Sequence, residues 1–365
     1  MLATFGCQEE EKPLVCQATG TCYQGGWNST SDGMRYAAFQ GIRFAQAPIG
    51  NLRFKAPQPL SNENLGTIDV SQESKVLCNQ LKDYYLLIGQ EDCLLLNIYI
   101  PENIFNDDDS EKRYPVMVWI YGGGFTIGDN TFFKYGPQPY MDKDIILVTA
   151  NYRLGPFGFL SLGSEGAQGN NGLLDQNLAL HWVQDNIGSF SGDPEMVTIF
   201  GESAGSLSVA LQIVSPMSRG LFQRAILQSG VVLAPTWHFI PPIEATLYGA
   251  NMAINLNCSL MDALECLQSK PVEDIFQGEF PGSKWMPTID PSFMPETPWD
   301  ILQKGEFDHS IEIIMGSNAD EGLLFVNSQT DFDDWRNNFE LNGPLWLYYL
   351  HNFEITEENI NNAQK

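Results

Sequence analysis

The feature that most restricts the fold is a strand, a tight turn and a helix in direct succession. The segment MVTIFGESAGSLSVALQI, residues 196–213, opens with a β-branched run, passes Gly201, Ser203 and Gly205, and ends in a helix-compatible stretch. A strand that turns so sharply strains its central residue, and only small neighbours let strand and helix pass. A GxSxG pentapeptide alone can be an ordinary glycine-rich turn. Its setting here predicts that Ser203 is an exposed nucleophile, with a helix N-terminus behind it that favours negative charge.

Apolar runs of strand length recur along the chain with longer mixed segments between them, which predicts an α/β fold. Helical spacing of apolar residues from Leu173 to Val183, with a stop at Gly188, predicts a crossover helix. This order implies a mostly parallel sheet with helices on both faces, where reactive groups collect beyond the carboxyl ends of the strands. The predicted strands are residues 116–121, 145–151, 196–200, 224–227 and 311–315.

Three glycines follow one of these strands, in PVMVWIYGGGF. They could form a flexible turn, but a glycine-rich loop at this place is also the second source of oxyanion donors for such a serine. We expect the N–H groups of Gly123, Gly124 and Ala204 to bind the oxyanion, with Tyr121 where the HGGG-type loop has histidine. A phosphate-binding loop is disfavoured, because neither GK[ST] nor GxGxxG occurs here.

The late strand IEIIMG leads into two adjacent carboxylates, and either Asp320 or Glu321 could be the acid that orients a catalytic histidine. The sequence has histidines at 181, 238, 309 and 351, of which only His351 follows the acid. It lies in an amphipathic stretch, not at a strand end, so we interpret it as a surface or packing residue.

Composition excludes several classes of protein. The chain has 19 Lys and Arg against 45 Asp and Glu, a net charge of −26, which disfavours nucleic acid and anionic membranes as partners. We interpret this charge as a solvated surface. We expect no membrane span, because no apolar run reaches the 18 or so residues required. Residues 1 to about 25 are interpreted as an extension or a signal remnant.

Cysteines and sequons indicate an oxidising compartment. Of seven cysteines, Cys78 with Cys93 and Cys258 with Cys266 are close in sequence, and neither pair has the CxxC spacing of a zinc site, which favours disulfides. Sequons at Asn28 and Asn257 predict glycosylation. Together they predict a secreted protein.

Several long segments resemble the type-B carboxylesterase and cholinesterase family, over nearly the entire chain. Besides GESAG and YGGGF, they are FQGIRFAQAPIGNLRFKAPQP, EDCLLLNIYIP, NYRLGPFGFL, NNGLLDQNLALHWVQDNI and SRGLFQRAILQSG. The resemblance implies an α/β-hydrolase fold with Ser203 as nucleophile, Glu321 of NADEG as the acid, and Gly123, Gly124 and Ala204 as oxyanion donors.

The resemblance also implies specific pairs. It pairs Cys78 with Cys93 and Cys258 with Cys266, and it predicts buried ion pairs of Arg43 with Glu91 and of Arg153 with Asp175. Outside the family pattern, Cys16 and Cys22 could bridge an early hairpin, which would leave Cys7 unpaired.

Two departures from the family matter. Its members place the catalytic histidine in a glycine-flanked segment much farther beyond the acid than the 44 residues (365 minus 321) that follow Glu321. The loop from Cys78 to Cys93 is short and lacks the tryptophan on which cholinesterases stack choline, so acetylcholine is a poor candidate substrate. Trp237 and Phe125 could line an acyl or alcohol pocket or belong to the core.

We therefore expect one carboxylesterase type-B domain over residues 1–365, incomplete at its C-terminal end. The predicted function is hydrolysis of a small carboxylic ester through an acyl-enzyme intermediate, with no cofactor and no metal. The catalytic histidine is expected beyond Lys365, which would leave the 365-residue chain alone inactive. The alternatives are a catalytically inactive, cholinesterase-like adhesion or binding protein, and a nonfunctional fragment. The oligomeric state is left open.

Overall fold

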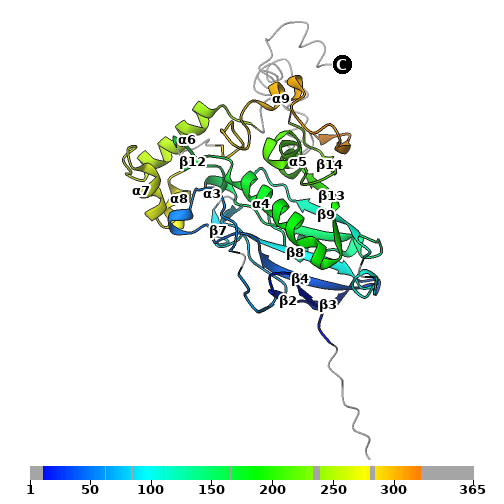
Figure 1. The fold of residues 1–365 in the computed structure, drawn as a ribbon. Coiled ribbons are helices and arrows are strands. Elements are labelled where there is room, and N and C mark those ends of the chain that lie inside the picture. The colour runs from blue at the N-terminus through cyan, green and yellow to red at the C-terminus, as the bar shows by residue number, and fades with distance from the viewer. Residues whose placement is uncertain are drawn as a thin grey trace, which may run out of the picture.

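Within the described part of the chain, eight strands form a central sheet (Figure 1). The computed structural model describes residues 11–321 apart from residues 62, 84, 110, 165, 233–238 and 280–283. In spatial order the strands are β15 (Glu312–Gly316), β14 (Arg224–Gln228), β13 (Gly192–Glu202), β9 (Tyr114–Ile120), β10 (Ile146–Ala150), β8 (Leu95–Pro101), β4 (Arg35–Arg43) and β3 (Gly26–Ser29).

The sheet has a parallel half and an antiparallel half. All pairings from β10 through β9, β13 and β14 to β15 are parallel. Those from β10 through β8 and β4 to β3 are antiparallel. The five strands predicted from sequence make up the parallel half, which confirms the predicted α/β architecture there.

Smaller sheets and helices surround this sheet. The small sheets pair β1 (Leu14–Cys16) with β2 (Cys22–Gln24) and β2 with β5 (Thr67–Asp69), β6 (Gln80–Lys82) with β7 (Leu86–Ile88), and β11 (Ser161–Ser164) with β12 (Ala167–Gln168). The α-helices are α1 (Glu102–Phe105), α2 (Phe132–Tyr135), α3 (Gly155–Phe159), α4 (Asn171–Asn186), α5 (Ala204–Val214), α6 (Pro242–Asn255), α7 (Ala263–Ser269), α8 (Val272–Gln277) and α9 (Pro298–Lys304). The 3-10 helices are η1 (Gly50–Leu52), η2 (Gln138–Tyr140), η3 (Ile187–Phe190) and η4 (Pro216–Ser218).

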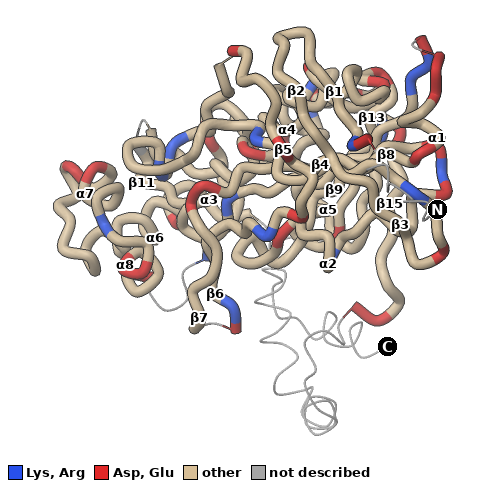
Figure 2. Tube along the Cα trace, turned by 90° about the horizontal axis from the view of Figure 1, so that it is seen from below, with Lys and Arg blue, Asp and Glu red and all other residues tan. Residues whose placement is uncertain are grey.

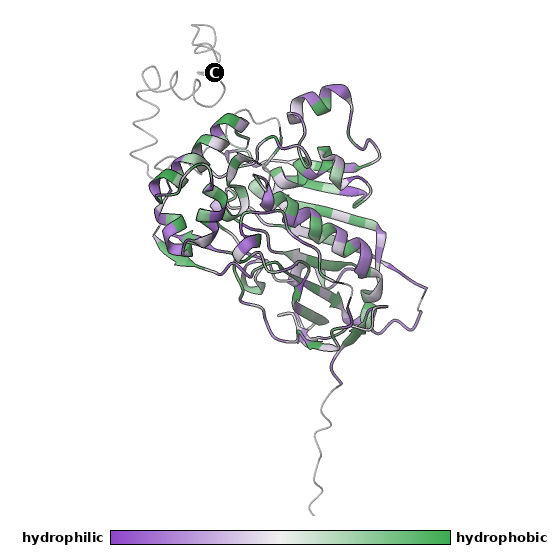
Figure 3. Ribbon diagram, turned by 60° about the vertical axis from the view of Figure 1, so that its left-hand side comes forward, coloured by the Kyte–Doolittle hydropathy of each residue, from purple (hydrophilic) through white to green (hydrophobic). Residues whose placement is uncertain are grey.

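Helices α4 and α5 cover one face of the parallel half (Figure 1). Every residue of α5 is buried, as expected for a helix that is apolar on most of its surface. Figure 3 shows hydrophobic residues concentrated along the sheet strands and the inner faces of the helices. On the opposite face, Tyr36, Tyr99 and Phe200 form a smaller core against Phe132 of α2 and Tyr140 of η2.

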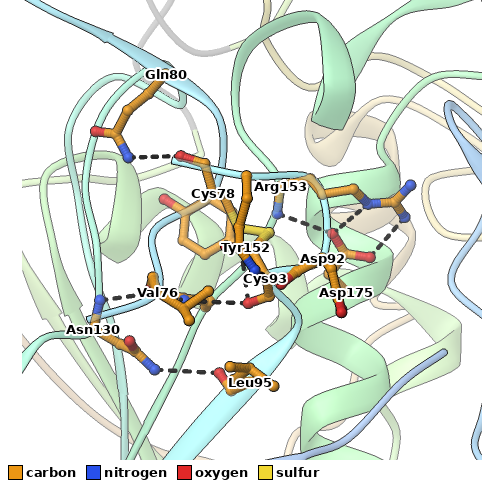
Figure 4. The surroundings of a disulfide bond; sticks show 12 residues. Val76, Cys78, Gln80, Asp92, Cys93, Leu95, Asn130, Tyr152, Arg153 and Asp175 are labelled. Atoms are coloured by element: carbon orange, nitrogen blue, oxygen red, sulfur yellow. Dashed lines mark hydrogen bonds and ion pairs between the residues drawn. A yellow bond between two sulfur atoms is a disulfide. The ribbon is translucent and has the colours of Figure 1, made fainter. Parts of the chain in front are cut away.

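One predicted buried ion pair is confirmed. The Nη2 atom of Arg153 lies 2.7 Å from Oδ1 of Asp175, and Nε lies 2.8 Å from Oδ2 (Figure 4). The two side chains are 3% and 0% exposed. The Arg153 N–H also donates to Asp175, so this one carboxylate ties the segment after β10 to helix α4.

The predicted pair of Arg43 with Glu91 is wrong. Arg43 forms its bidentate bond with Asp92, and Glu91 instead binds the buried Arg53, with both Nε and Nη2 at 2.6 Å. Glu91 lies in a bend before β8, where the Cys93 N–H donates to the carbonyl oxygen of Glu91, and this turn directs the two neighbouring acids to different arginines. Arg53 is the buried partner because it follows η1 and also donates to the carbonyl oxygen of Leu267.

The structure contains three disulfides: Cys78–Cys93, Cys258–Cys266 and Cys16–Cys22. The first two pair the cysteines that the family resemblance pairs, and the third joins the hairpin of β1 and β2. Cys7 lies outside the described residues. The two sequon asparagines, Asn28 on β3 and Asn257 after α6, are exposed.

Charged residues are distributed over the turns and helix ends, with acidic ones prominent near α1, α7 and α8 (Figure 2). Lys and Arg are interspersed among them instead of forming one basic surface. Within the described residues, no helix combines the length and apolar character needed to cross a bilayer.

Candidate active site

Ser203 occupies a strained turn between β13 and α5. Its φ is 56° and its ψ is −124°, outside the regions that residues with side chains usually adopt. Its N–H donates to the carbonyl oxygen of Gln228 at 2.9 Å, and its own carbonyl oxygen accepts the N–H of Leu207 at 2.9 Å. These two bonds hold the turn against the end of β14 and the first turn of α5. Such a backbone costs about 1–3 kcal/mol and persists only where its surroundings impose it.

Glycines make this turn sterically possible. A Cβ atom on Gly205 would lie 2.1 Å from the carbonyl oxygen of Ile120, and one on Gly201 would lie 2.6 Å from the same oxygen. A Cβ atom on Gly230 would lie 2.5 Å from the carbonyl oxygen of Ser203. Strand β9, the elbow and the segment after β14 therefore approach one another more closely than any side chain allows.

The glycine loop after β9 lies beside the elbow. A Cβ atom on Gly122 would lie 3.1 Å from the Cβ atom of Ser203, so the two segments are in contact. Gly123 and Gly124 have φ values of 117° and 62°, which favour glycine. Within the described residues, the N–H groups of Gly123, Gly124 and Ala204 have no hydrogen-bond acceptor. Ala204 is the first residue of α5, whose N–H has no partner within a helix.

Glu321, at the end of β15, has a backbone donor beside its carboxylate. The N–H of Asn318 donates to its Oε1 atom at 2.8 Å. The hydroxyl of Ser229 and this N–H hold the pKa of Glu321 below its ordinary value, because both stabilise the anion. Asp320 is exposed beside it. The effect of Ser229, which follows β14, on the carboxylate of Glu321 favours Glu321 over Asp320 as the acid of the site.

Glu202, next to Ser203 in the chain, is a further carboxylate of the candidate site. It precedes Ser203 and contacts Gly122 through its carboxylate, whose Oε2 atom lies 3.2 Å from a Cβ atom built there. Its pKa is raised, first because the protein removes part of its hydration and second because Glu321 is negatively charged. The electrostatic effect indicates that Glu202 and Glu321 lie on the same side of the sheet end as Ser203.

A histidine base is not assembled from the described residues. His309 bonds to the carbonyl oxygen of Gly305 at 3.1 Å, and His181 lines a separate cavity with Gln17 and Trp182. His238 and His351 lie outside the described residues. No three His, Cys, Asp or Glu side chains in the described part of the chain are grouped to hold a metal.

Phe125 and Trp237 were considered as pocket walls, and the structure describes only the first of them. Phe125 is buried and its ring centroid lies 5.0 Å from that of Phe159, which favours the core interpretation. Trp237 lies outside the described residues.

Sequence reasoning did not single out Ser229, Gly230 or Glu202 as parts of the site. The first two directly follow β14, so their place beyond the carboxyl end of a parallel strand was the signal available. Glu202 lies inside the GESAG motif itself, next to Ser203.

Comparisons with known proteins show the family of the chain. The model of the carboxylesterase family matches residues 13–359. A carboxylic ester hydrolase of Bombus ignitus is 38% identical over 360 residues, covering 91% of this chain and 62% of that protein. An acetylcholinesterase of Leptinotarsa decemlineata is 34% identical over 393 residues, covering 97% and 61%. Esterase E4 of Myzus persicae is 35% identical over 372 residues, covering 97% and 65%. The chain thus spans about three fifths of the length of these relatives.

Proposed function

The chain belongs to the carboxylesterase family, and we propose that it acts as a serine carboxylic-ester hydrolase with Ser203 as its nucleophile. The observation that carries the proposal is the strained elbow at Ser203 beside the N–H groups of Gly123, Gly124 and Ala204, which have no acceptor among the described residues. Conformational strain of this kind persists at sites of function, where the surrounding packing imposes it.

In the proposed reaction the Ser203 oxygen attacks the ester carbonyl carbon. The carbonyl oxygen becomes an oxyanion that accepts hydrogen bonds from the three N–H groups. The alcohol leaves, an acyl group remains on Ser203, and water releases it. Each donor of this kind contributes roughly 100 to 1000-fold to the rate. Glu321 orients a histidine base, which the proposal places outside the described residues.

The substrate is proposed to be a small neutral carboxylic ester. The loop between Cys78 and Cys93 is occupied by the short hairpin of β6 and β7 and contains no tryptophan on which a quaternary ammonium could stack. The named activity of the acetylcholinesterase relative is therefore not carried over to this chain.

Labelling and turnover test this proposal together. The full chain is treated with a fluorophosphonate probe, which reacts with activated serines, and with a short-chain p-nitrophenyl ester. We expect the probe mass on the peptide that contains Ser203 and its loss in Ser203→Ala. The control Ser310→Ala removes an exposed hydroxyl that bonds only to Asp308 in the described structure.

The two readouts separate the possible outcomes. Labelling of Ser203 together with ester turnover supports the hydrolase. Labelling of Ser203 with a turnover about 10^6-fold below that of an intact serine triad would indicate that the nucleophile is in place but its histidine base is missing. Neither labelling nor turnover would contradict the proposal and favour an inactive adhesion or binding protein, or a nonfunctional fragment.

Secretion and glycosylation are part of the same proposal. Three disulfides persist most readily in an oxidising compartment, and the asparagines of both sequons, Asn28 and Asn257, are exposed. Expression in a eukaryotic secretory host should give a mass that falls on treatment with peptide N-glycosidase. Asn28→Gln combined with Asn257→Gln should abolish that fall.

A further inference from the structure

The loop that carries the proposed oxyanion donors is rich in glycine, and its one deeply buried side chain, that of Phe125, lies in its middle. Between Tyr121 and Gly128 the backbone has positive φ at Gly123, Gly124, Phe125 and Gly128. Glycine adopts a positive φ without steric cost, but a glycine-rich segment on its own samples many backbone conformations. Holding it in one conformation therefore costs conformational entropy. Oxyanion donors help only when their direction is set before reaction. The rest of the protein must therefore hold the loop.

Its first end is held by Tyr152. The Tyr152 hydroxyl donates to the carbonyl oxygen of Tyr121 at 2.8 Å, and the Tyr121 hydroxyl donates in return to the carbonyl oxygen of Tyr152 at 3.0 Å. The Tyr152 N–H also donates to the Tyr121 hydroxyl at 3.2 Å. The two rings are stacked with centroids 4.4 Å apart, and both residues are 0% exposed. Burial raises the pKa of each phenol, so both hydroxyls stay protonated donors.

Its second end is held by Gln80. The side-chain amide of Gln80 donates to the carbonyl oxygen of Gly128 at 2.8 Å and accepts the Gly128 N–H at 2.9 Å. The same amide donates to the carbonyl oxygen of Cys78 at 3.0 Å (Figure 4). Gln80 is 5% exposed and lies two residues from the disulfide of Cys78 with Cys93. The disulfide loop is thus bonded directly to the last residue of the oxyanion loop.

An internal turn completes the constraint. The carbonyl oxygen of Gly123 accepts the N–H groups of Thr126 and Ile127, both at 3.1 Å. A trans peptide is planar, so its C=O and N–H point in opposite directions. Fixing the carbonyl of Gly123 toward the turn therefore directs the N–H of Gly124 away from it, free to bind an anion. This orientation depends on both ends of the loop staying in place.

We propose that Tyr152 and Gln80 are positioning residues that grip the two ends of the oxyanion loop. The inference rests on the proposed esterase function. Neither side chain touches the reacting atoms, so each acts on the transition state through the loop and not on binding of the ester. The two residues come from separate segments, the one after β10 and strand β6, and each bonds to a different end of the loop.

Steady-state kinetics of the full chain test the role in catalysis. Tyr152→Phe removes one hydroxyl and keeps the stacked ring, and Gln80→Leu removes both bonds to Gly128. Each variant should lower kcat by roughly 10-fold or more with KM changed less than about 3-fold, because the oxyanion exists only in the transition state. The control Tyr99→Phe removes another buried hydroxyl, which bonds to Gln40, and Gln184→Leu removes another amide that bonds to two backbone carbonyls. Both controls should leave kcat within about 2-fold.

Amide hydrogen exchange tests the grip itself, independently of turnover. The N–H groups of Thr126, Ile127 and Gly128 should exchange roughly 10-fold faster or more in Tyr152→Phe and Gln80→Leu, and unchanged in the two controls. If Gln80→Leu fails to fold, Gln80→Asn replaces it, since its amide is one methylene too short to reach both Gly128 groups.

The outcomes are distinguishable. Unchanged exchange in the loop overturns the proposal, and so does faster exchange with kcat equal to that of the controls. Absence of both Ser203 labelling and ester turnover in the parent chain contradicts the proposed function instead, and the exchange data then decide alone whether the two residues hold the loop.

Discussion

The centre of the sheet and its β15 edge hold the two parts of the candidate site in different ways. At the centre, the elbow of Ser203 is surrounded by glycines at which neighbouring atoms leave no room for a Cβ atom. At the edge, all five residues of β15 are exposed, and a Cβ atom on Gly316 would meet nothing within 4 Å among the described atoms. The proposed nucleophile Ser203 is thus placed by packing, whereas the proposed acid Glu321 is placed by polar interactions. Mutations at the two places should differ in cost accordingly.

The largest difference is expected between the ion pairs of the two regions. Asp175→Ala leaves the guanidinium of Arg153 buried without its counter-charge, and we expect it to lower the free energy of unfolding by about 3–5 kcal/mol. Glu312→Ala breaks an exposed pair with Arg224 that joins β15 to β14, which should cost less than about 1 kcal/mol. Urea unfolding of the full chain measures both. Similar costs at the two positions would contradict the contrast between centre and edge.

Adding one methyl group, by a Gly→Ala substitution, should lower stability more at the centre than at the edge, by a smaller amount than the ion-pair variants. Gly205→Ala places a Cβ atom against the backbone oxygen of Ile120, which cannot move without shifting β9, and should cost about 1–3 kcal/mol. Gly316→Ala adds its methyl group to open space and should change stability by less than about 0.5 kcal/mol. The urea midpoints of the two variants decide this. If Gly205→Ala is as harmless as Gly316→Ala, the elbow is not held by packing.

Sequence could predict the parts of the site whose residues lie close together in one segment of the chain. A strand, a small-residue turn and a helix follow one another at Ser203, so the elbow is encoded within one segment. The glycines after β9 are likewise readable, because strand ends and glycine runs are local signals. The parallel half of the sheet followed from the same alternation. The antiparallel half was not predicted, since mixed sheets depend on which strands meet and not on their own composition.

The parts that sequence could not predict depend on contacts between distant segments. Gln80 and Tyr152 look like ordinary residues of a short hairpin and of a strand end, and only the fold brings both to the loop before Gly128. The misassigned partner of Arg43 has the same origin. Two adjacent acids, Glu91 and Asp92, were equally available in sequence, and the turn in which they lie before β8 decided between them.

The smallest expected effect concerns the support of the acid at the sheet edge. Ser229→Ala removes the first of the groups that stabilise the Glu321 anion, so the pKa of Glu321 should rise toward its ordinary value. In the parent chain the depressed pKa gives stability that is present above the unfolded pKa and is lost as pH falls through the folded one. In the variant the folded and unfolded pKa values of Glu321 should lie closer together, so less stability should be lost as the pH falls. Carbon NMR titration of the Glu321 carboxyl, assigned by comparison with Glu321→Gln, measures the shift.

A matched control for this titration lies elsewhere on the surface. Ser310 stabilises the carboxylate of Asp308 as Ser229 stabilises that of Glu321, through its hydroxyl, and its N–H also donates. Ser310→Ala should raise the pKa of Asp308 and leave that of Glu321 unchanged. If Ser229→Ala leaves the Glu321 titration where it was, the N–H of Asn318 is the main support of the acid. The edge of the site would then be self-contained in the segment after β15, because that donor comes from the same turn as Glu321 and not from β14.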